Sequence, residues 1–141
     1  MTWRDDAVSV ARSWLGTPYH HRARIKGVGT DCGMILIAVF SECGVIEDFD
    51  PGEYAQEWMM HRSEEKYLEA VERYATKVER DPLPGDIVLF KFGRCISHGA
   101  IVSEWPCIIH AYMQAGMVVE DNLDTNEALK NRLIGVWSVG K

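Results

Sequence analysis

The sequence predicts a single α+β domain of 141 residues, with helices in the first half of the chain and an antiparallel sheet in the second half. In the first half, apolar residues recur at the spacing of a helix face. After the turn-forming segment 81–86, the pattern changes to short β-type runs separated by turns. Helices followed by strands in this way favour α+β over a parallel α/β sheet. The length fits one domain, residues 1–141, with a core of its own.

The first helix is predicted over residues 4–15. Its apolar residues fall on one face, and Thr2 or Trp3 precedes it as a cap. Gly16 ends this helix, since glycine readily adopts the left-handed conformation that follows a last helical turn.

The second helix is predicted from Thr30 or Asp31, either of which can cap it, to about Cys43, with Gly44 after it as the stop. Residues 34–40 are apolar on every side, and a helix of this kind is buried on every side. We therefore expect the sheet to wrap around this helix.

The other segments have less regular patterns. Residues 20–30 form a basic, glycine-containing loop, and residues 45–62 are irregular. A third helix, rich in Glu and Lys with one apolar face, is predicted over residues 63–78. Five short strands follow, at residues 87–92, 98–102, 107–111, 117–120 and 133–139.

The charge pattern excludes several classes of function. Fifteen Lys and Arg residues stand against 21 Asp and Glu residues, a formal net charge of −6. Binding to nucleic acid or to anionic lipid needs a basic surface, so neither is expected. The N-terminus lacks the basic start and apolar run of a secretory signal, and no apolar run approaches the roughly 20 residues that cross a bilayer. We expect cytoplasmic synthesis without a signal peptide and no membrane insertion.

Cys32 is the candidate nucleophile. It lies in the first turn of the predicted buried helix, where free N–H groups and the positive end of the helix dipole lower the pKa of a cysteine and can hold an oxyanion. The alternative interpretation is a small buried apolar residue at a helix start. Cys43, Cys95 and Cys107 lack such surroundings and are interpreted as structural.

A nucleophilic cysteine needs a base, and His98 and His110 lie in neighbouring predicted strands. If Ile101 pairs with Cys107 across the hairpin, His98 lies directly opposite His110 on one face of the sheet. One imidazole can then act as the base while the other orients it. The remaining histidines are interpreted as solvated loop residues: His20, His21 and His61.

A zinc site is the second interpretation of the same residues. Cys32, His98 and His110 can bind zinc, with a water molecule in the fourth position. No carboxylate is recognisably tied to these histidines in the sequence, although zinc-binding histidines usually have such a partner. The sequence therefore predicts no metal and no cofactor, and the zinc site stays an alternative.

Five blocks of sequence follow one another in a set order. They are residues 11–19 (ARSWLGTPY), 29–32 (GTDC), 84–90 (PGDIVLF), 97–102 (SHGAIV) and 108–111 (IIHA). In composition and order they resemble the NlpC/P60 cysteine peptidases, and the resemblance extends from about residue 7 to residue 138.

The resemblance implies a fold and a reaction. The fold is papain-like, with the nucleophile helix packed on an antiparallel sheet. The reaction is cleavage of peptidoglycan stem peptides, typically between γ-D-glutamate and the diamino acid. Carried over by position, Cys32 is the nucleophile, His98 is the general base and acid, and His110 orients His98.

The resemblance also implies three substrate-binding positions. Tyr19 matches a tyrosine near the nucleophile that shapes substrate binding, and Asp31 matches an acidic residue that recognises a free peptide amine. Gly33 stands where relatives often carry a serine that helps to hold the substrate, and Met34 stands where they often carry a glycine. No cofactor is implied.

The short chain, the segment that begins at residue 84 and the acidic insert over residues 53–80 resemble the phage-tail and gene-transfer-agent branch of this family. That branch implies tail or baseplate proteins as partners and action on the cell wall or in the periplasm from a virion or a phage-like particle. One alternative is a structural tail component with a lost active site, which the change at Gly33 and Met34 would suit. Another is an amidase or acyltransferase that acts on a different amide.

Overall fold

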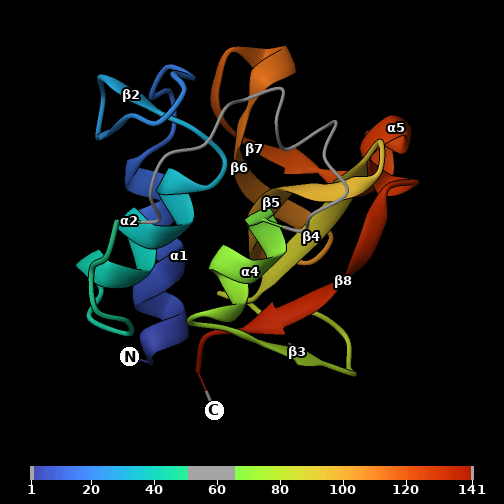
Figure 1. Cartoon of the computed structure of the whole chain (residues 1–141), viewed down its shortest axis with the longest axis horizontal. Helices are drawn as coiled ribbons and strands as arrows, with labels where there is room; N and C mark the ends of the chain where they lie inside the picture. The colour runs from blue at the N-terminus through green and yellow to red at the C-terminus, as the bar shows by residue number, and fades with distance from the viewer. Residues whose placement is uncertain (1, 51–65, 141) are drawn as a thin grey trace.

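The computed structural model describes residues 2–50 and 66–140 (Figure 1). The elements in chain order are α1 (Trp3–Ser13), β1 (Arg24–Ile25), β2 (Gly29–Thr30), α2 (Met34–Glu42), α4 (Lys66–Glu72), β3 (Thr76–Val78), β4 (Ile87–Phe92), β5 (Cys95–Glu104), β6 (Cys107–Tyr112), the 3₁₀ turn η1 (Met113–Ala115), β7 (Met117–Asn122), the 3₁₀ turn η2 (Leu123–Thr125), α5 (Glu127–Lys130) and β8 (Leu133–Ser138). The longer helices precede the main strands, as the sequence predicts.

Within the described residues, six strands form one antiparallel sheet in the order β3-β8-β4-β5-β6-β7. α1 and α2 stand side by side against this sheet, and α4 also contacts β5 (Figure 1). β1 and β2 form a separate two-stranded hairpin. The expected α+β class with an antiparallel sheet is confirmed.

α1 begins with a capping box. The Thr2 hydroxyl accepts a hydrogen bond from the Asp5 backbone N–H, and the Asp5 carboxylate accepts one from the Thr2 backbone N–H. The buried face of the helix carries Ala7, Val8 and Ala11. This short-side-chain face lets α1 lie close to α2.

α2 is buried on every side, as its composition predicts. All of its residues from Met34 to Phe40 are buried. The turn before it is already helical, because the Ile35 N–H donates to the Asp31 carbonyl oxygen at 3.1 Å. Gly44 follows the helix with a φ of +79°, a conformation that favours glycine. Both predicted ends of this helix are therefore confirmed.

The third predicted helix is wrong at its C-terminal end. α4 ends at Glu72, and residues 76–78 form β3, which pairs with β8. Pairing with a strand from the far end of the chain overrides a helical pattern that is only local. Residues 63–65 of this predicted helix, and residues 51–62 of the predicted irregular stretch, lie outside the described residues.

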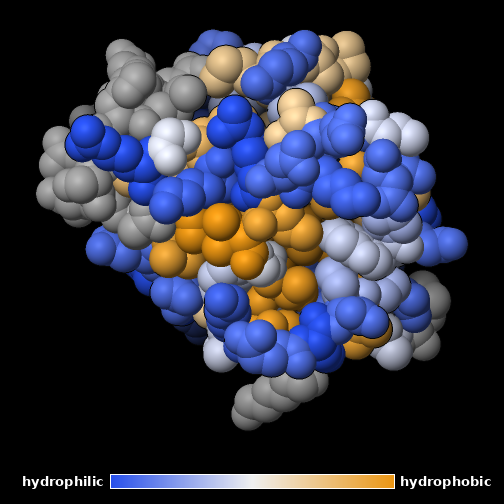
Figure 2. All heavy atoms as spheres, turned by 90° about the vertical axis from the view of Figure 1, so that its right-hand side faces the viewer, coloured by the Kyte–Doolittle hydropathy of each residue, from blue (hydrophilic) through white to orange (hydrophobic). Residues whose placement is uncertain are grey.

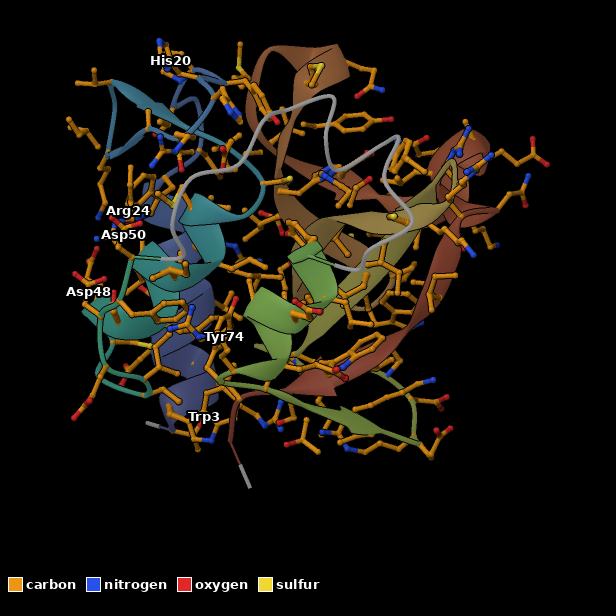
Figure 3. All side chains as sticks on the ribbon, in the orientation of Figure 1. Trp3, His20, Arg24, Asp48, Asp50 and Tyr74 are labelled. Carbon is orange, nitrogen blue, oxygen red and sulfur yellow. The ribbon has the colours of Figure 1, made fainter. Side chains whose placement is uncertain are left out.

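The segment 20–30 is not a plain loop. Arg24 pairs with Thr30 and Ile25 with Gly29 in a short hairpin, and its second strand is buried. The Arg24 guanidinium bonds the Asp48 carboxylate at 2.5 and 3.1 Å, and the two side chains lie together at the left of Figure 3. This ion pair holds the hairpin against the segment that follows α2.

The register between β5 and β6 differs from the predicted one. Ile101 pairs with Ile109 rather than with Cys107, because the turn between the strands holds only Trp105 and Pro106. The pairing shifts by one residue between Val102 and Glu104. The residue between them, Ser103, is thus an extra residue in β5, a β-bulge.

Both faces of the sheet carry apolar residues. Ile87 and Leu89 of β4 belong to a cluster shared with the helices, whereas Val88 and Phe90 belong to a second cluster on the other face. A strand buried on both faces reads as a continuous apolar run, which explains the composition of β4. Figure 2 looks at the side of the molecule that lies to the right in Figure 1. It shows hydrophobic atoms in the centre, with hydrophilic residues around them.

Candidate active site

Cys32 lies at the start of α2, where the sequence places it. The carboxylate of Asp31 caps the helix: its Oδ1 accepts hydrogen bonds from the backbone N–H groups of Gly33 at 3.1 Å and Met34 at 2.9 Å. The Cys32 side chain is 6% exposed. The nucleophile candidate is therefore held in a rigid turn between Asp31 and the first residue of the helix.

Three groups contact Cys32. Its Sγ donates to the carbonyl oxygen of Ser97 at 3.5 Å, and its own carbonyl oxygen accepts a hydrogen bond of 2.8 Å from the Tyr67 hydroxyl. The Tyr19 side chain also interacts electrostatically with Cys32. Because Ser97 precedes His98 in β5, the thiol lies against the strand that carries the candidate base.

The prediction of a lowered thiol pKa is wrong. Burial raises the pKa of Cys32, the negative charge of Asp31 raises it further, and hydrogen bonds from Tyr67 and Tyr19 only partly oppose these effects. The helix N-terminus opposes this rise only through the backbone N–H of Cys32, because the N–H groups of Gly33 and Met34 are taken by Asp31. The resting sulfur is a neutral thiol.

The two candidate imidazoles are in direct contact. His98 Nε2 lies 2.8 Å from His110 Nδ1, and the ring centroids are 5.0 Å apart. Extending the β5–β6 register places the two residues diagonally on one face, rather than directly opposite as predicted. The predicted contact between the imidazoles is confirmed, and the predicted β5–β6 register is wrong by two residues.

Burial also controls the charge of this pair. It lowers the pKa of His98, and the neighbouring His110 lowers it further. Burial lowers the pKa of His110 to about 4, against the opposing charge and hydrogen bonding of Asp121. Both rings are therefore neutral near neutral pH. Aromatic rings surround His98, with centroids at 5.6 Å (Phe90), 6.1 Å (Phe92) and 5.7 Å (Tyr112).

Cys32 approaches β5, the strand of the candidate base, at Ser97 and not through a hydrogen bond to an imidazole. In residues 2–50 and 66–140, Sγ of Cys32 bonds the Ser97 carbonyl rather than either ring, and His98 Nδ1 has no hydrogen-bond partner. Catalytic hydrogen bonds are often long before substrate binds. Transfer of the thiol proton to His98 Nδ1 stays a prediction.

The predicted substrate-binding residues adjoin the thiol. Tyr19 is half-buried, and its backbone pairs with Thr30 just before Asp31. Asp31 is 2% exposed, and its Oδ2 accepts from the Arg22 backbone N–H at 2.7 Å and lies 3.7 Å from His21 Nδ1. Through these contacts Asp31 joins the segment at Arg22 to the start of α2. Binding of substrate by Tyr19, Asp31 and Gly33 stays a prediction.

The two other histidines that the structure describes, His20 and His21, lie in the segment that leads to Asp31. His20 is exposed, and it lies at the end of the molecule away from Trp3 (Figure 3). His21 contacts Asp31 and is half-buried, so it is less solvated than predicted. His61 lies outside the described residues.

Sequence reasoning missed two residues of the site. Tyr67 belongs to the predicted apolar face of the third helix, and nothing in its spacing shows that its hydroxyl reaches Cys32. Asp121 Oδ2 lies 3.6 Å from His110 Nε2. Glycine at position 99 is the available signal for Tyr67, because a Cβ there would lie 2.7 Å from the Tyr67 hydroxyl oxygen.

The geometry gives the zinc interpretation no support. In the part of the chain that the structure describes, no three His, Cys, Asp or Glu side chains converge as metal ligands. The same part of the chain contains no helix with the length and apolar character of a membrane span.

Known proteins with a similar sequence or structure agree with the observed fold. The model of the NlpC/P60 family matches residues 16–138, and no curated protein matches the chain. Among solved structures, NlpC1 from Trichomonas vaginalis is 14% identical with a TM-score of 0.67, and the match covers 98% of this chain and 47% of that one. The chain thus spans about half the length of that protein.

Two further structures match over nearly their whole length. The NlpC/p60 domain of the peptidoglycan hydrolase SagA is 17% identical with a TM-score of 0.62, and the match covers 96% of this chain and 97% of that domain. An N-acetylmuramoyl-L-alanine amidase from Bacteroides uniformis is 13% identical with a TM-score of 0.62, again over 96% and 97%. At these identities the likeness establishes the fold, and it confirms the expected papain-like architecture.

Proposed function

The chain belongs to the NlpC/P60 family, and on this basis we propose that it hydrolyses an amide bond in the stem peptides of peptidoglycan. Cys32 is the nucleophile, His98 the general base and acid, and His110 the residue that orients His98. The observation that carries the proposal is the 2.8 Å contact between the two imidazoles, because His98 lies on the strand whose Ser97 carbonyl accepts the hydrogen bond of the Cys32 thiol.

The reaction starts from a neutral pair. As Sγ attacks the amide carbonyl carbon, the thiol proton passes to Nδ1 of His98, so no resting thiolate is needed. Burial lowers the pKa of His98, which leaves the ring neutral with a lone pair at Nδ1 but also makes it a weaker base. The imidazolium then gives the proton to the leaving amine, and the C–N bond breaks to leave a thioester. Water, deprotonated by His98, hydrolyses the thioester and restores the thiol.

The oxyanion of the tetrahedral intermediate needs donors beside the sulfur. Because Asp31 holds the N–H groups of Gly33 and Met34, the predicted helix-start donors are reduced to the N–H of Cys32 itself. Tyr19, whose side chain interacts electrostatically with Cys32, carries the second candidate donor, its hydroxyl group. These two groups would stabilise the oxyanion together.

The family and two similar structures support the proposed substrate. SagA is a peptidoglycan hydrolase, and the Bacteroides protein is an amidase of the same polymer. The bond between γ-D-glutamate and the diamino acid is the first candidate. The second candidate is the amide between muramic acid and L-alanine, the bond in the name of the Bacteroides amidase.

Digestion of purified sacculi tests the proposal. The wild-type protein should release soluble fragments, and mass spectrometry of the new amino groups identifies the bond that is cut. Cys32→Ala should release none, whereas Cys43→Ala, which changes a half-buried cysteine at the other end of α2, should act like wild type. Loss of His98 should cost more than loss of His110. Release at the wild-type rate by Cys32→Ala would refute the assignment of the nucleophile.

Delivery by a phage-like tail is the remaining part of the proposal. It is supported by the resemblance of the segment from residue 84 and of the insert over residues 53–80 to the tail-associated branch. Proteomic analysis of purified particles from the source strain should find this chain with tail or baseplate proteins. If the protein is a structural tail component with a lost site, an electrophilic stem-peptide probe will label Cys32 no faster than it labels Cys43.

A further inference from the structure

We propose that Asp121 is a positioning residue, which fixes the proton on Nε2 of His110 and thereby leaves Nδ1 of His98 free to accept the proton of Cys32. This inference rests on the proposed function. It adds a fourth side chain, from β7, to the three that the family resemblance implies.

The argument begins with the bond between the two rings. His98 Nε2 and His110 Nδ1 are 2.8 Å apart, so one of these nitrogens carries the proton and the other accepts it. A neutral imidazole has only one N–H group. If His98 is to take a proton at Nδ1, its own proton must be on Nε2, and His98 donates to His110. His110 then carries its proton on Nε2.

The surroundings of His110 Nε2 select this arrangement. This nitrogen is fully buried and has no hydrogen-bond partner within 3.5 Å in the described residues. The carboxylate oxygen Oδ2 of Asp121 lies 3.6 Å away, just beyond hydrogen-bond length. An N–H group at this position faces a negative acceptor, which is favourable, whereas a lone pair would face the same charge and be repelled. Asp121 therefore favours the Nε2–H form of His110.

Asp121 is itself held in place. It lies in β7, opposite Ile108 of β6, which makes it a diagonal neighbour of His110 on one face of the sheet. The Asn126 side-chain Nδ2 donates to Asp121 Oδ2 at 3.0 Å, while the side-chain Oδ1 of Asn126 accepts from the Leu129 backbone N–H at 3.3 Å at the start of α5. The helix cap fixes which end of the amide points at Asp121, so the carboxylate stays an acceptor.

The experiment measures tautomers and turnover separately. Histidine labelled with ¹⁵N shows by long-range proton–nitrogen NMR which ring nitrogen carries the proton. In the inactive Cys32→Ala protein, we expect Nε2–H for both His98 and His110. Adding Asp121→Asn should shift part of the His98 population to Nδ1–H, because an amide can offer its N–H group to His110. Adding Asp124→Asn, which removes an exposed carboxylate paired with Lys130, should leave both rings unchanged.

In the active protein, Asp121→Asn should lower kcat about 100-fold with little change in KM, and Asp121→Glu should recover part of the loss. Asp124→Asn should keep the wild-type kcat. An unchanged tautomer in Cys32→Ala/Asp121→Asn, or an unchanged kcat in Asp121→Asn, would overturn the inference. If the wild-type protein cuts no sacculi, the proposed function fails, while the NMR result still decides the role of Asp121.

Discussion

The hydroxyl group of Tyr67 donates a hydrogen bond of 2.8 Å to the carbonyl oxygen of Cys32. Tyr67 is buried and comes from α4, an element that lies 35 residues beyond the nucleophile in the chain. Gly99 of β5 makes room for this contact, because a Cβ there would meet the tyrosine oxygen at 2.7 Å. Helix α4 thus supports the backbone that carries the nucleophile.

Replacement of Tyr67 by phenylalanine should leave the Cys32 carbonyl without its partner. We expect a loss of about 1 kcal/mol in the free energy of unfolding, and a drop of about tenfold in kcat/KM as the nucleophile loses its support. Urea unfolding and assays on a stem peptide measure the two effects. The matched control is Tyr74→Phe, since Tyr74 also packs against the core and makes no hydrogen bond through its hydroxyl group in the described residues. Equal losses of unfolding free energy and of kcat/KM in both variants would contradict a special role of the Tyr67 hydroxyl group.

A methyl group at position 99 should destabilise the protein. Its effect on the free energy of unfolding should depend on whether residue 67 is tyrosine or phenylalanine. Gly99→Ala places a Cβ 2.7 Å from the Tyr67 oxygen and 3.0 Å from Leu89, which should cost about 2 kcal/mol of unfolding free energy. Removing the oxygen with Tyr67→Phe relieves the shorter contact. The double variant should therefore be less destabilised than the sum of the single variants. Simple additivity in urea unfolding would show that the two residues do not meet.

The buried histidines should make the fold sensitive to mild acid. The pKa of His110 falls from 6.5 when unfolded to about 4 when folded, so between these pH values the unfolded chain binds more protons. The free energy of unfolding should fall as the pH drops from 6.5 towards 4, by an amount on the order of 3 kcal/mol from His110. Denaturant titrations at several pH values measure this slope. A constant stability over this range would contradict the buried neutral ring.

Asp86 should affect the free energy of unfolding at a lower pH than the histidines do. Burial would raise its pKa, but hydrogen bonds from Arg80 and Arg4 outweigh burial and hold it below the usual 3.8. Its stabilising contribution is present above pH 3.8 and is lost only below it. In Asp86→Asn, the stability difference from wild type should therefore be constant from neutral pH to about pH 4 and shrink below that. A difference that already shrinks between pH 6 and pH 5 would contradict this order.

The resting thiol should react slowly. Because burial and the charge of Asp31 raise the pKa of Cys32, its alkylation by iodoacetamide should accelerate steadily with pH and show no plateau between about pH 5 and pH 8. Mass spectrometry of the modified peptide separates Cys32 from the other three cysteines. A plateau at acidic pH would indicate a preformed ion pair with His98 and would contradict the neutral resting state.

Much of the fold follows from the sequence alone. β4 occupies the predicted residues 87–92, and α1 and α2 begin and end near their predicted caps, because these signals are local. β3 could not be predicted, since it depends on pairing with β8 near the end of the chain. The hairpin of β1 and β2 also escaped, because strands of two residues leave no alternating pattern.

The candidate site also has features that the sequence predicts and features that depend on the folded chain. The pairing of His98 with His110 was predictable because it depends on the alternation of side chains along neighbouring strands. The charge of Cys32 was not, because it depends on where the Asp31 carboxylate turns in the folded loop. The contact of Asp121 with His110 also depends on the β6–β7 register.

The bulge at Ser103 has a consequence for how this hairpin can change. With a two-residue turn and no bulge, His98 and His110 would project from opposite sides of the sheet, because side chains alternate and the turn sets the count. The extra residue reverses that parity, and its hydroxyl is anchored to Glu120 at 2.7 Å, which in turn holds Arg12 of α1. The two imidazoles therefore lie on the same face because of the number of residues between them, and not because of the chemistry of any one side chain. In the β5–β6 turn and bulge, only insertions or deletions of an even number of residues would keep the two imidazoles on the same face. Substitutions in this turn and bulge would not change that face.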